Sequence, residues 1–366
     1  MMVWDWWWDW RERRSALKDL KERQRFEEAV LMDQNLNPLN LAKLSLDSGD
    51  SVKAASLWQR ARAVLPNAVL ESPDSLEILL GLKRYDEADA LMRERGKRFP
   101  GDRFYLTGLA RIAEQRGDLE DALKRWIVAR DHMTDTIDGY HGCARCLIAL
   151  DRLDEAEAQY DAALRRGRDN LDACIGRALI SDRRKDWGES LVRWKHVADT
   201  FRFGPAFAFY AKALVELGRV DEADAWLEVP SRIYPSDLEI AVTRSHLALR
   251  RGDLAAACDR WARVRGIDPY FQTGYHEGAN RLVEAERHAE AEAVLRAAIE
   301  RFPDQIWPLR NFARLAHDRR DWNEAATRWD ALRQRFPEEE AGYSLGAEAL
   351  KAAGRDDEAA ALHRGP

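Results

Sequence analysis

The chain lacks the segments that would place it in or across a membrane. No apolar run approaches the roughly 20 residues that span a bilayer. Asp5 and Asp9 interrupt the only apolar stretch at the start, and basic residues follow that stretch instead of preceding it, unlike in a secretory signal. With only 4 cysteines in 366 residues, the chain also suits a reducing compartment. We therefore expect a cytoplasmic protein.

Signatures of catalysis and of cofactor binding are lacking as well. The chain has no phosphate-binding glycine loop, no nucleophile elbow and no zinc-protease helix. Cys143 and Cys146 have the spacing of a metal knuckle, and His141 and Cys174 are near them. The two cysteines fall inside a predicted helix, however, and buried small residues are the favoured interpretation. We expect no catalytic residue, no metal and no cofactor.

The chain also has no excess of positive charge. Its formal net charge is −6 and its sequence pI is near 5.9, which gives no overall attraction to nucleic acid. Arginine far outnumbers lysine and alanine is abundant, a composition that favours a GC-rich bacterial genome. We therefore expect a bacterial protein that does not bind nucleic acid.

What the chain does have is a period of 34 residues. A small residue follows the acidic start of every second predicted helix, at Ala54, Ala88, Ala122, Ala156, Ser190, Ala223, Ala257, Ala291, Ala325 and Ala359. Successive members are 34 residues apart except for one step of 33, between Ser190 and Ala223. A second small-residue column stands twelve residues earlier, at Ala42, Ala110, Ala144, Ala178, Ala211, Ala279, Ala313 and Ala347, with Leu76 and Ser245 as exceptions.

The residues around these columns predict a helical pair in each repeat. Between the columns lie turns such as Gly117-Asp118, where glycine ends one helix and aspartate caps the next. Large residues that fill the space left by the small ones follow at Trp58, Met92, Trp126, Tyr160, Trp194, Trp261, Leu295 and Trp329. Prolines that can stop a helix and open the next follow at Pro66, Pro100, Pro235, Pro269, Pro303 and Pro337.

This pattern resembles the tetratricopeptide repeat family, whose unit is a 34-residue pair of antiparallel helices with small residues at its eighth and twentieth places. The resemblance covers residues 35–366. It implies an all-α fold, a right-handed superhelical solenoid of about ten helix-turn-helix repeats. Residues 1–34 are expected to form a separate, tryptophan-rich helical segment. Such a solenoid is built to hold a partner, and the repeat does not say which one.

The repeat is expected to be irregular between copies five and six, at residues 195–235. The 33-residue step falls near this range, together with an aromatic-rich run at residues 201–210. Pro230 is expected to interrupt the second helix of the sixth copy, at a cost of about 3 kcal/mol. Repacking around a kink is favoured over an aromatic contact site or a hinge.

The start of the chain is the first candidate for a specific contact. Five of its 14 tryptophans are Trp4, Trp6, Trp7, Trp8 and Trp10. On a helix this segment is amphipathic. Three roles stay open: a cap on the first repeat, which is favoured; a contact with a protein partner or with a second copy; and docking at the inner membrane surface.

A basic column on the first helices is the second candidate. In the family these helices line the concave wall, and the residue after the first small column points into the groove. Here that column reads Lys43, Glu77, Arg111, Arg145, Leu179, Lys212, His246, Asn280, Arg314 and Glu348. One helical turn earlier stand His141, His276 and Arg310. The alternative is a solvated face of mixed charge. We predict a positive groove formed by Lys43, Arg111, His141, Arg145, Lys212, His246, His276, Asn280, Arg310 and Arg314.

These observations predict a non-enzymatic scaffold or adaptor that binds an acidic or extended protein segment in its groove. The alternative is an accessory subunit of a bacterial polysaccharide- or glycan-modifying glycosyltransferase complex, docked at the membrane through the tryptophan-rich segment. That alternative rests on analogy with other proteins of this repeat type. A catalytic subunit found with the chain would distinguish the two.

Overall fold

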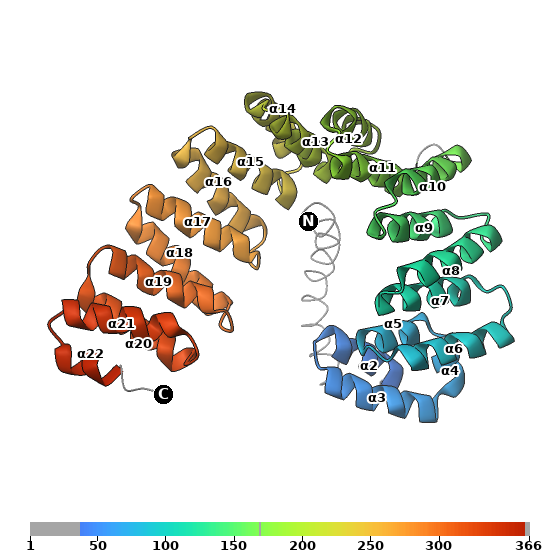
Figure 1. Cartoon of the computed structure of the whole chain (residues 1–366), viewed down its shortest axis with the longest axis horizontal. Helices are drawn as coiled ribbons and strands as arrows, with labels where there is room; N and C mark the ends of the chain where they lie inside the picture. Colours follow the sequence, from blue (N-terminus) through green and yellow to red (C-terminus); the bar gives the residue numbers. More distant parts are fainter. Residues whose placement is uncertain (1–36, 168–169, 363–366) are drawn as a thin grey trace. The chain divides into compact units, whose positions relative to one another are not determined.

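The computed structural model describes residues 37–167 and 170–362. Within these ranges the chain forms 21 helices and no strand, so the predicted all-α class is confirmed. The chain divides into two compact units, one up to Arg193 and one from Trp194 onward. Each unit is a stack of helical pairs, in which helices that follow one another in the chain lie side by side (Figure 1).

Each repeat contributes one first helix and one second helix. The first helices are α2 (Pro38–Asp47), α5 (Pro73–Gly81), α7 (Arg103–Arg116), α9 (Asp138–Ala149), α11 (Leu171–Arg184), α13 (Gly204–Glu216), α15 (Leu238–Arg250), α17 (Gln272–Glu284), α19 (Ile306–Asp318) and α21 (Glu340–Ala352). The second helices are α3 (Ser51–Val64), α6 (Tyr85–Arg98), α8 (Leu119–His132), α10 (Leu153–Arg166), α12 (Trp187–Phe201), α14 (Val220–Ile233), α16 (Leu254–Ile267), α18 (His288–Arg301), α20 (Trp322–Arg335) and α22 (Asp356–Leu362).

Repeat two has an additional short helix, α4 (Pro66–Glu71), before α5. Ser72 separates the two helices in an extended conformation, with φ −77° and ψ 133°. The proline ring of Pro73 disfavours the helical conformation for the residue before it. The Ser72 hydroxyl then accepts a hydrogen bond from the Asp74 amide at 3.2 Å and caps α5. The 34-residue pattern did not predict this division.

Both small-residue columns are buried, as predicted. All ten members of the column from Ala54 to Ala359 have an exposure of 0%. The ten members of the earlier column, Leu76 and Ser245 included, are at most 2% exposed. The large side chains between them are buried too, and Trp194, Trp261 and Trp329 have no exposed surface. The core is therefore a row of small residues that lets the helices approach, and at least eight of the ten repeats add one large residue that fills the space beside it.

The turns between the two helices also repeat. Their central residue has a positive φ in all ten repeats, at Gly49, Lys83, Gly117, Asp151, Lys185, Gly218, Gly252, Glu286, Arg320 and Gly354. Glycine adopts this conformation without strain and accounts for five of the ten. The predicted aspartate caps are confirmed: Asp118 accepts from the Asp121 amide at 3.1 Å, and Asp253 accepts from the Ala256 amide at 2.9 Å.

Pro230 does not interrupt its helix, so that expectation was wrong. It is buried inside α14, which continues to Ile233, and its carbonyl accepts from the Tyr234 amide at 2.8 Å. Pro230 lies in the last turn, where its missing N–H leaves only the Trp226 carbonyl without a helical donor. The helices α12, α13 and α14 are each continuous through the range in which we expected irregularity.

Successive repeats differ in a way that gives the stack a longer period of two repeats. In the odd repeats the large core residue is tryptophan, at Trp58, Trp126, Trp194, Trp261 and Trp329. From repeat three onward an arginine precedes this tryptophan and pairs with a carboxylate on the second helix of the preceding even repeat. The four pairs, which we call the interhelix locks, are Arg125–Asp89 at 3.4 Å, Arg193–Glu157 at 2.5 Å, Arg260–Asp224 at 2.9 Å and Arg328–Glu292 at 3.0 Å.

Each lock also ties the second helix to the first helix of its own repeat. The lock arginines donate to the carbonyls of Leu109, Arg177, Arg244 and Phe312, sixteen residues earlier, at 2.5 to 3.0 Å. A second arginine, at the end of the first helix, reinforces three of the locks: Arg184 bonds Glu157, Arg251 bonds Asp224 at 2.6 Å, and Arg319 bonds Glu292 at 3.2 Å. The boundary between an even repeat and the next odd repeat therefore has these ion pairs beside its apolar contacts, and tryptophan packs the other boundary.

Candidate interaction surface

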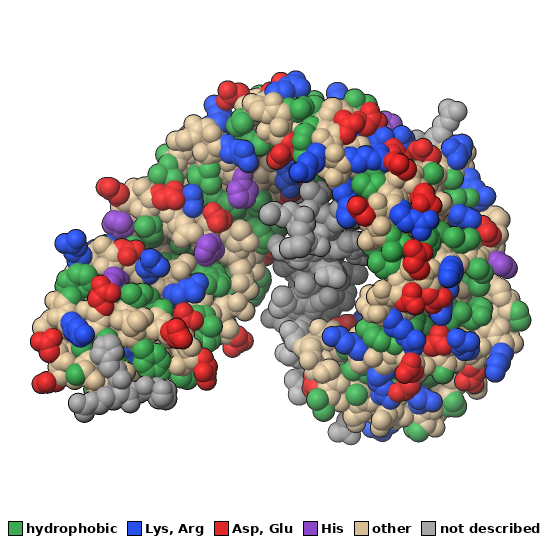
Figure 2. All heavy atoms as spheres, viewed as in Figure 1, with side chains coloured by type: hydrophobic (Ala, Val, Ile, Leu, Met, Phe, Trp, Pro, Cys, Tyr) green, Lys and Arg blue, Asp and Glu red, His purple; other side chains and the backbone are tan. Residues whose placement is uncertain are grey.

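The first helices form the more closely packed side of each stack. Besides their partners within the repeat, first helices of successive repeats contact one another: α5 with α7 and α9 with α11 in the first unit, α13 with α15 and α19 with α21 in the second. The predicted groove residues lie on these helices. Figure 2 shows acidic and basic side chains interspersed over the visible face of both units, without a region of one sign alone.

In the first unit the predicted cations are paired with carboxylates. Arg111 contacts Glu77 of the preceding first helix at 2.7 Å, and Arg145 donates twice to Glu114, at 2.6 and 2.7 Å. Lys43 pairs with Asp47 on its own helix. These are direct, charge-assisted hydrogen bonds. The first two pairs link neighbouring repeats, and in all three a carboxylate lies beside the predicted cation, as on a face of mixed charge.

Aromatic rings flank two of the predicted residues in the first unit. The Arg145 guanidinium lies 5.6 Å from the centre of the Trp126 ring, and the His141 ring lies 5.9 Å from that of Tyr160. Trp126 in turn donates to Glu114 at 3.0 Å. Glu114 therefore joins a core tryptophan to Arg145 across two repeats. Our sequence reading missed Glu114, although it lies one helical turn after Arg111.

Two more members of the column lie on α13 and α15 in the second unit. Lys212 pairs with the buried carboxylate of Glu239, and its ammonium lies 4.9 Å from the centre of the Phe209 ring. The His246 ring stands edge-on to Trp261, with 5.1 Å between the centres. Partial desolvation lowers the pKa of His246 below its ordinary value, although the charge of Glu277 opposes this shift. The environment of His246 therefore favours its neutral form.

The other four predicted residues lie on α17 and α19, two helices that Trp307 joins. The His276 ring lies edge-on to Trp307, 5.4 Å between centres, and Asn280 lies 3.4 Å from His276 Nδ1. Trp307 Nε1 donates to Gln272 of α17 at 3.2 Å, which fixes the two helices against each other. Arg310 and Arg314 follow Trp307 along α19. We call His276, Asn280, Trp307, Arg310 and Arg314 the α17–α19 surface.

The arginines of this surface are held less tightly than those of the first unit. Arg310 is 3.8 Å from Glu339 and Arg314 is 3.9 Å from Asp318, both longer than a direct charged hydrogen bond. Their side chains are 48% and 68% exposed. Trp307 was not among the predicted residues. The sequence could have indicated Trp307, because it stands near the start of a predicted first helix. It also lies outside both small-residue columns and outside the column of large core residues.

The repeat length, the two buried columns and the left-handed turn residue together decide the architecture. The chain has the tetratricopeptide repeat fold. Its 21 helices within residues 37–362 pack as adjacent pairs, with the small residues at the places that the resemblance implied.

Comparison with known proteins adds little to this assignment. No family model matches the chain, and no curated protein matches it. The similar solved structures include a tetratricopeptide repeat protein from Parabacteroides merdae, with 16% identity, 67% of this chain and 97% of that chain covered, and a TM-score of 0.44. They also include the Cut9–Hcn1 structure (12% identity, 86% and 63% covered, TM-score 0.42) and a protein of this repeat type from Thermus thermophilus (22% identity, 48% and 95% covered, TM-score 0.38).

The cysteines are buried parts of this tetratricopeptide core. Cys143 and Cys146 are at most 1% exposed, and none of the four cysteines is in a disulfide. Burial raises the pKa of Cys143 to about 11. Burial, followed by the charge of Glu114, raises that of Cys146, whose Sγ lies 3.3 Å from the Glu114 carboxylate. Both shifts favour the thiol over the thiolate. Across residues 37–167 and 170–362, no three His, Cys, Asp or Glu side chains gather as ligands for a metal ion.

The predicted contact at the start of the chain lies outside the described residues. Trp4, Trp6, Trp7, Trp8 and Trp10 therefore keep the roles expected from the sequence alone. In the part of the chain that the structure describes, no helix is long and apolar enough to cross a bilayer.

Proposed function

We propose that the protein is a non-enzymatic cytoplasmic scaffold that binds an extended, acidic protein segment at the α17–α19 surface. The observation that carries this proposal is the loose pairing of Arg310 and Arg314, at 3.8 and 3.9 Å from their carboxylates. A carboxylate of a partner can make a direct hydrogen bond to either guanidinium without breaking one within the protein. Lys43, Arg111, His141 and Arg145 belong to the first unit and are not part of this site.

Trp307 and Asn280 offer an apolar and a polar contact in addition to the two arginines. Trp307 is half-buried and its ring lies one helical turn before Arg310, so a segment lying along α19 meets an apolar face and then a cation. Aromatic and arginine side chains are enriched among residues that dominate binding energy. Asn280 adds an amide on the neighbouring helix, which can bond the main chain of an extended segment.

A peptide display library screened against the full chain tests the proposal. We expect the enriched peptides to carry spaced Asp or Glu beside an apolar residue. Arg310→Gln with Arg314→Gln should then weaken the selected peptide about 2- to 30-fold, since exposed ion pairs contribute about 0.2–1 kcal/mol each. Arg335→Gln removes one positive charge from an exposed site on a second helix and should change nothing. Peptides without acids, or equal binding by the double variant and the control, would overturn the proposal.

Two further measurements complete the test: the salt dependence of the affinity and the identity of a captured partner. The affinity of the wild-type chain should fall as salt rises, and that of the double variant should fall less. Capture of the partner by the full chain, followed by its identification, separates the scaffold from the accessory glycosyltransferase subunit. A glycosyltransferase in the captured complex would favour the latter.

A further inference from the structure

The four interhelix locks are not equivalent, and the one in repeat seven lacks a carboxylate. In three locks, an acid four residues before the arginine accepts from its Nε at 2.7 Å. These acids are Asp121 for Arg125, Glu189 for Arg193 and Glu324 for Arg328. In repeat seven the corresponding residue is Ala256. Arg260 therefore has only Asp224 as a carboxylate partner among the described residues.

The same lock has two additional arginines. Arg244 of α15 lies against it, with Nε 3.6 Å from Asp224 and Nη1 2.7 Å from the Ser231 hydroxyl. At this place repeats three and nine have Leu109 and Phe312. Repeat five has Arg177, but it has its own carboxylate, Asp161, at 3.0 Å.

Arg263 is the second addition, and it lies one helical turn after Arg260 on α16. It donates to the carbonyls of Ser231 and Pro235, at 3.1 and 3.2 Å. The corresponding residues in the other three locks are Val128, His196 and Ala331. Arg244, Arg251 and Arg260 thus reach the carboxylates of Asp221 and Asp224, and Arg263 lies beside them. With Asp237, four arginines stand against three carboxylates here, an excess of one positive charge.

The electrostatics of the cluster reflect that excess. Burial, and then the charge of Arg260, lower the pKa of Arg244 below its ordinary value. Burial raises the pKa of Asp224, but the hydrogen bond and charge of Arg260 outweigh it, so the net shift is downward. One carboxylate is thus shared among several guanidiniums. An added negative charge here is stabilised by groups that are already in place.

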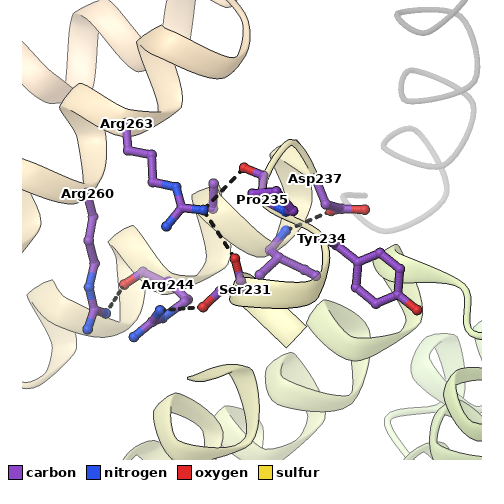
Figure 3. A pocket seen from close by; sticks show the side chains of 9 residues that line it. Ser231, Tyr234, Pro235, Asp237, Arg244, Arg260 and Arg263 are labelled. Atoms are coloured by element: carbon purple, nitrogen blue, oxygen red, sulfur yellow. Dashed lines mark hydrogen bonds between the residues drawn. The ribbon is translucent and has the colours of Figure 1, made fainter. Parts of the chain in front are cut away.

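A pocket opens beside these arginines. It has a volume of about 30 Å³ and lies between α14, α15 and α16, where Arg244, Arg260 and Arg263 line one side and Ser231 the other (Figure 3). Asp237 also lines it, but its carboxylate caps α15 by accepting from the Ile240 amide at 3.0 Å. The hydroxyl of Tyr234 donates to the Arg202 carbonyl at 2.9 Å. The donors that remain at the pocket are guanidinium groups.

We propose that this pocket binds a small oxyanion, a carboxylate or a phosphate group. Arginine is suited to both through paired N–H donors on a planar group. A volume near 30 Å³ is room for one or two water molecules, and so for the head of an anion and not for a whole ligand. The anion contacts Arg244, Arg260 and Arg263, which line the pocket, whereas Ala256 does not line it. The site lies on different helices from the α17–α19 surface and does not depend on it.

Unfolding of the full chain in sodium phosphate, sodium acetate and sodium chloride at equal ionic strength tests the proposal. We expect the unfolding midpoint to rise with phosphate or acetate and to saturate, because a ligand that binds only the folded state stabilises it. Titration calorimetry with the same two salts gives the affinity. Tighter binding of phosphate assigns a phosphate group, and tighter binding of acetate assigns a carboxylate. Equal midpoints in all three salts would overturn the proposal.

Two variants locate the effect, and a third is the matched control. Arg263→Gln removes one of the three guanidinium groups that line the pocket, so it should reduce the response to the oxyanion at least five-fold. Arg244→Gln should reduce that response to a similar extent. Arg177→Gln changes the corresponding arginine of repeat five, and its response should equal that of the wild type. An oxyanion response that survives unchanged in Arg263→Gln would contradict the assignment, even if Arg244→Gln does not fold.

Discussion

Replacing a lock arginine should cost far more stability than replacing an exposed arginine that contacts the same carboxylate. Arg328 is 6% exposed and bonds Glu292 at 3.0 Å, Glu324 at 2.7 Å and the Phe312 carbonyl at 3.0 Å. Its guanidinium also lies 3.7 Å from the centre of the Phe312 ring. Arg296 is 62% exposed and reaches Glu292 only at 3.6 Å. The two side chains therefore share a partner but differ in burial.

The magnitude follows from that difference. Removing one member of a buried ion pair costs about 3–5 kcal/mol, because the other charge is left without its partner. Glu292 keeps Arg319 at 3.2 Å, so for Arg328→Gln we expect the lower end, about 3 kcal/mol. An exposed pair contributes up to about 1 kcal/mol, and Arg296→Gln should cost no more than that.

Native-state hydrogen exchange is the appropriate assay here, because it reports the local opening of each helix in a repeat array separately. A loss of about 3 kcal/mol should speed exchange in α18, α19 and α20 about 100-fold in Arg328→Gln. Exchange in the helices of the first unit should not change. Equal exchange in Arg328→Gln and Arg296→Gln would refute the view that the locks stabilise the even–odd boundaries.

Three further predictions concern packing, pH and the start of the chain. Gly142→Ala should destabilise the first unit by about 1–3 kcal/mol, because the added Cβ would lie 2.1 Å from the Trp126 ring; an unchanged unfolding midpoint would contradict this. The folded-state pKa of Asp224 is below its ordinary value, so its stabilising effect is present above the unfolded-state pKa and is lost as pH falls through the folded-state value. Acid titration of Asp224→Asn should therefore show a weaker loss of stability below about pH 4 than the wild type shows, and parallel curves would exclude this role. Deletion of residues 1–10 should lower stability if the tryptophans cap the first repeat, or abolish partner or liposome binding if they form an interface, and a deletion without any effect would show a dispensable tail.

The sequence alone determined the repeat, the helical pairs and the core. Ala54 and Ala88 recur because the contact between two helices leaves no room for a larger side chain, and such a local steric demand is visible in one chain. The turn residue with a positive φ is harder to recognise in the sequence. Some repeats have glycine at this position, whereas others have residues such as Lys185 and Glu286. The sequence also contains the alternation of odd and even repeats, because an arginine precedes Trp126, Trp194, Trp261 and Trp329. We did not recognise it, since the 34-residue period is the stronger pattern.

The tertiary structure decided what the charged residues do. Arg145 looks like a groove cation in the sequence, yet it is neutralised by Glu114, 31 residues earlier, because stacking brings the two first helices together. Arg310 and Arg314 are also arginines on a first helix, but no carboxylate lies within direct hydrogen-bonding distance of either one. Ion pairing depends on distances of a few tenths of an ångström between side chains of different repeats. A periodic pattern fixes which helices are neighbours, whereas the register and rotamers that fix those distances exist only in the folded chain.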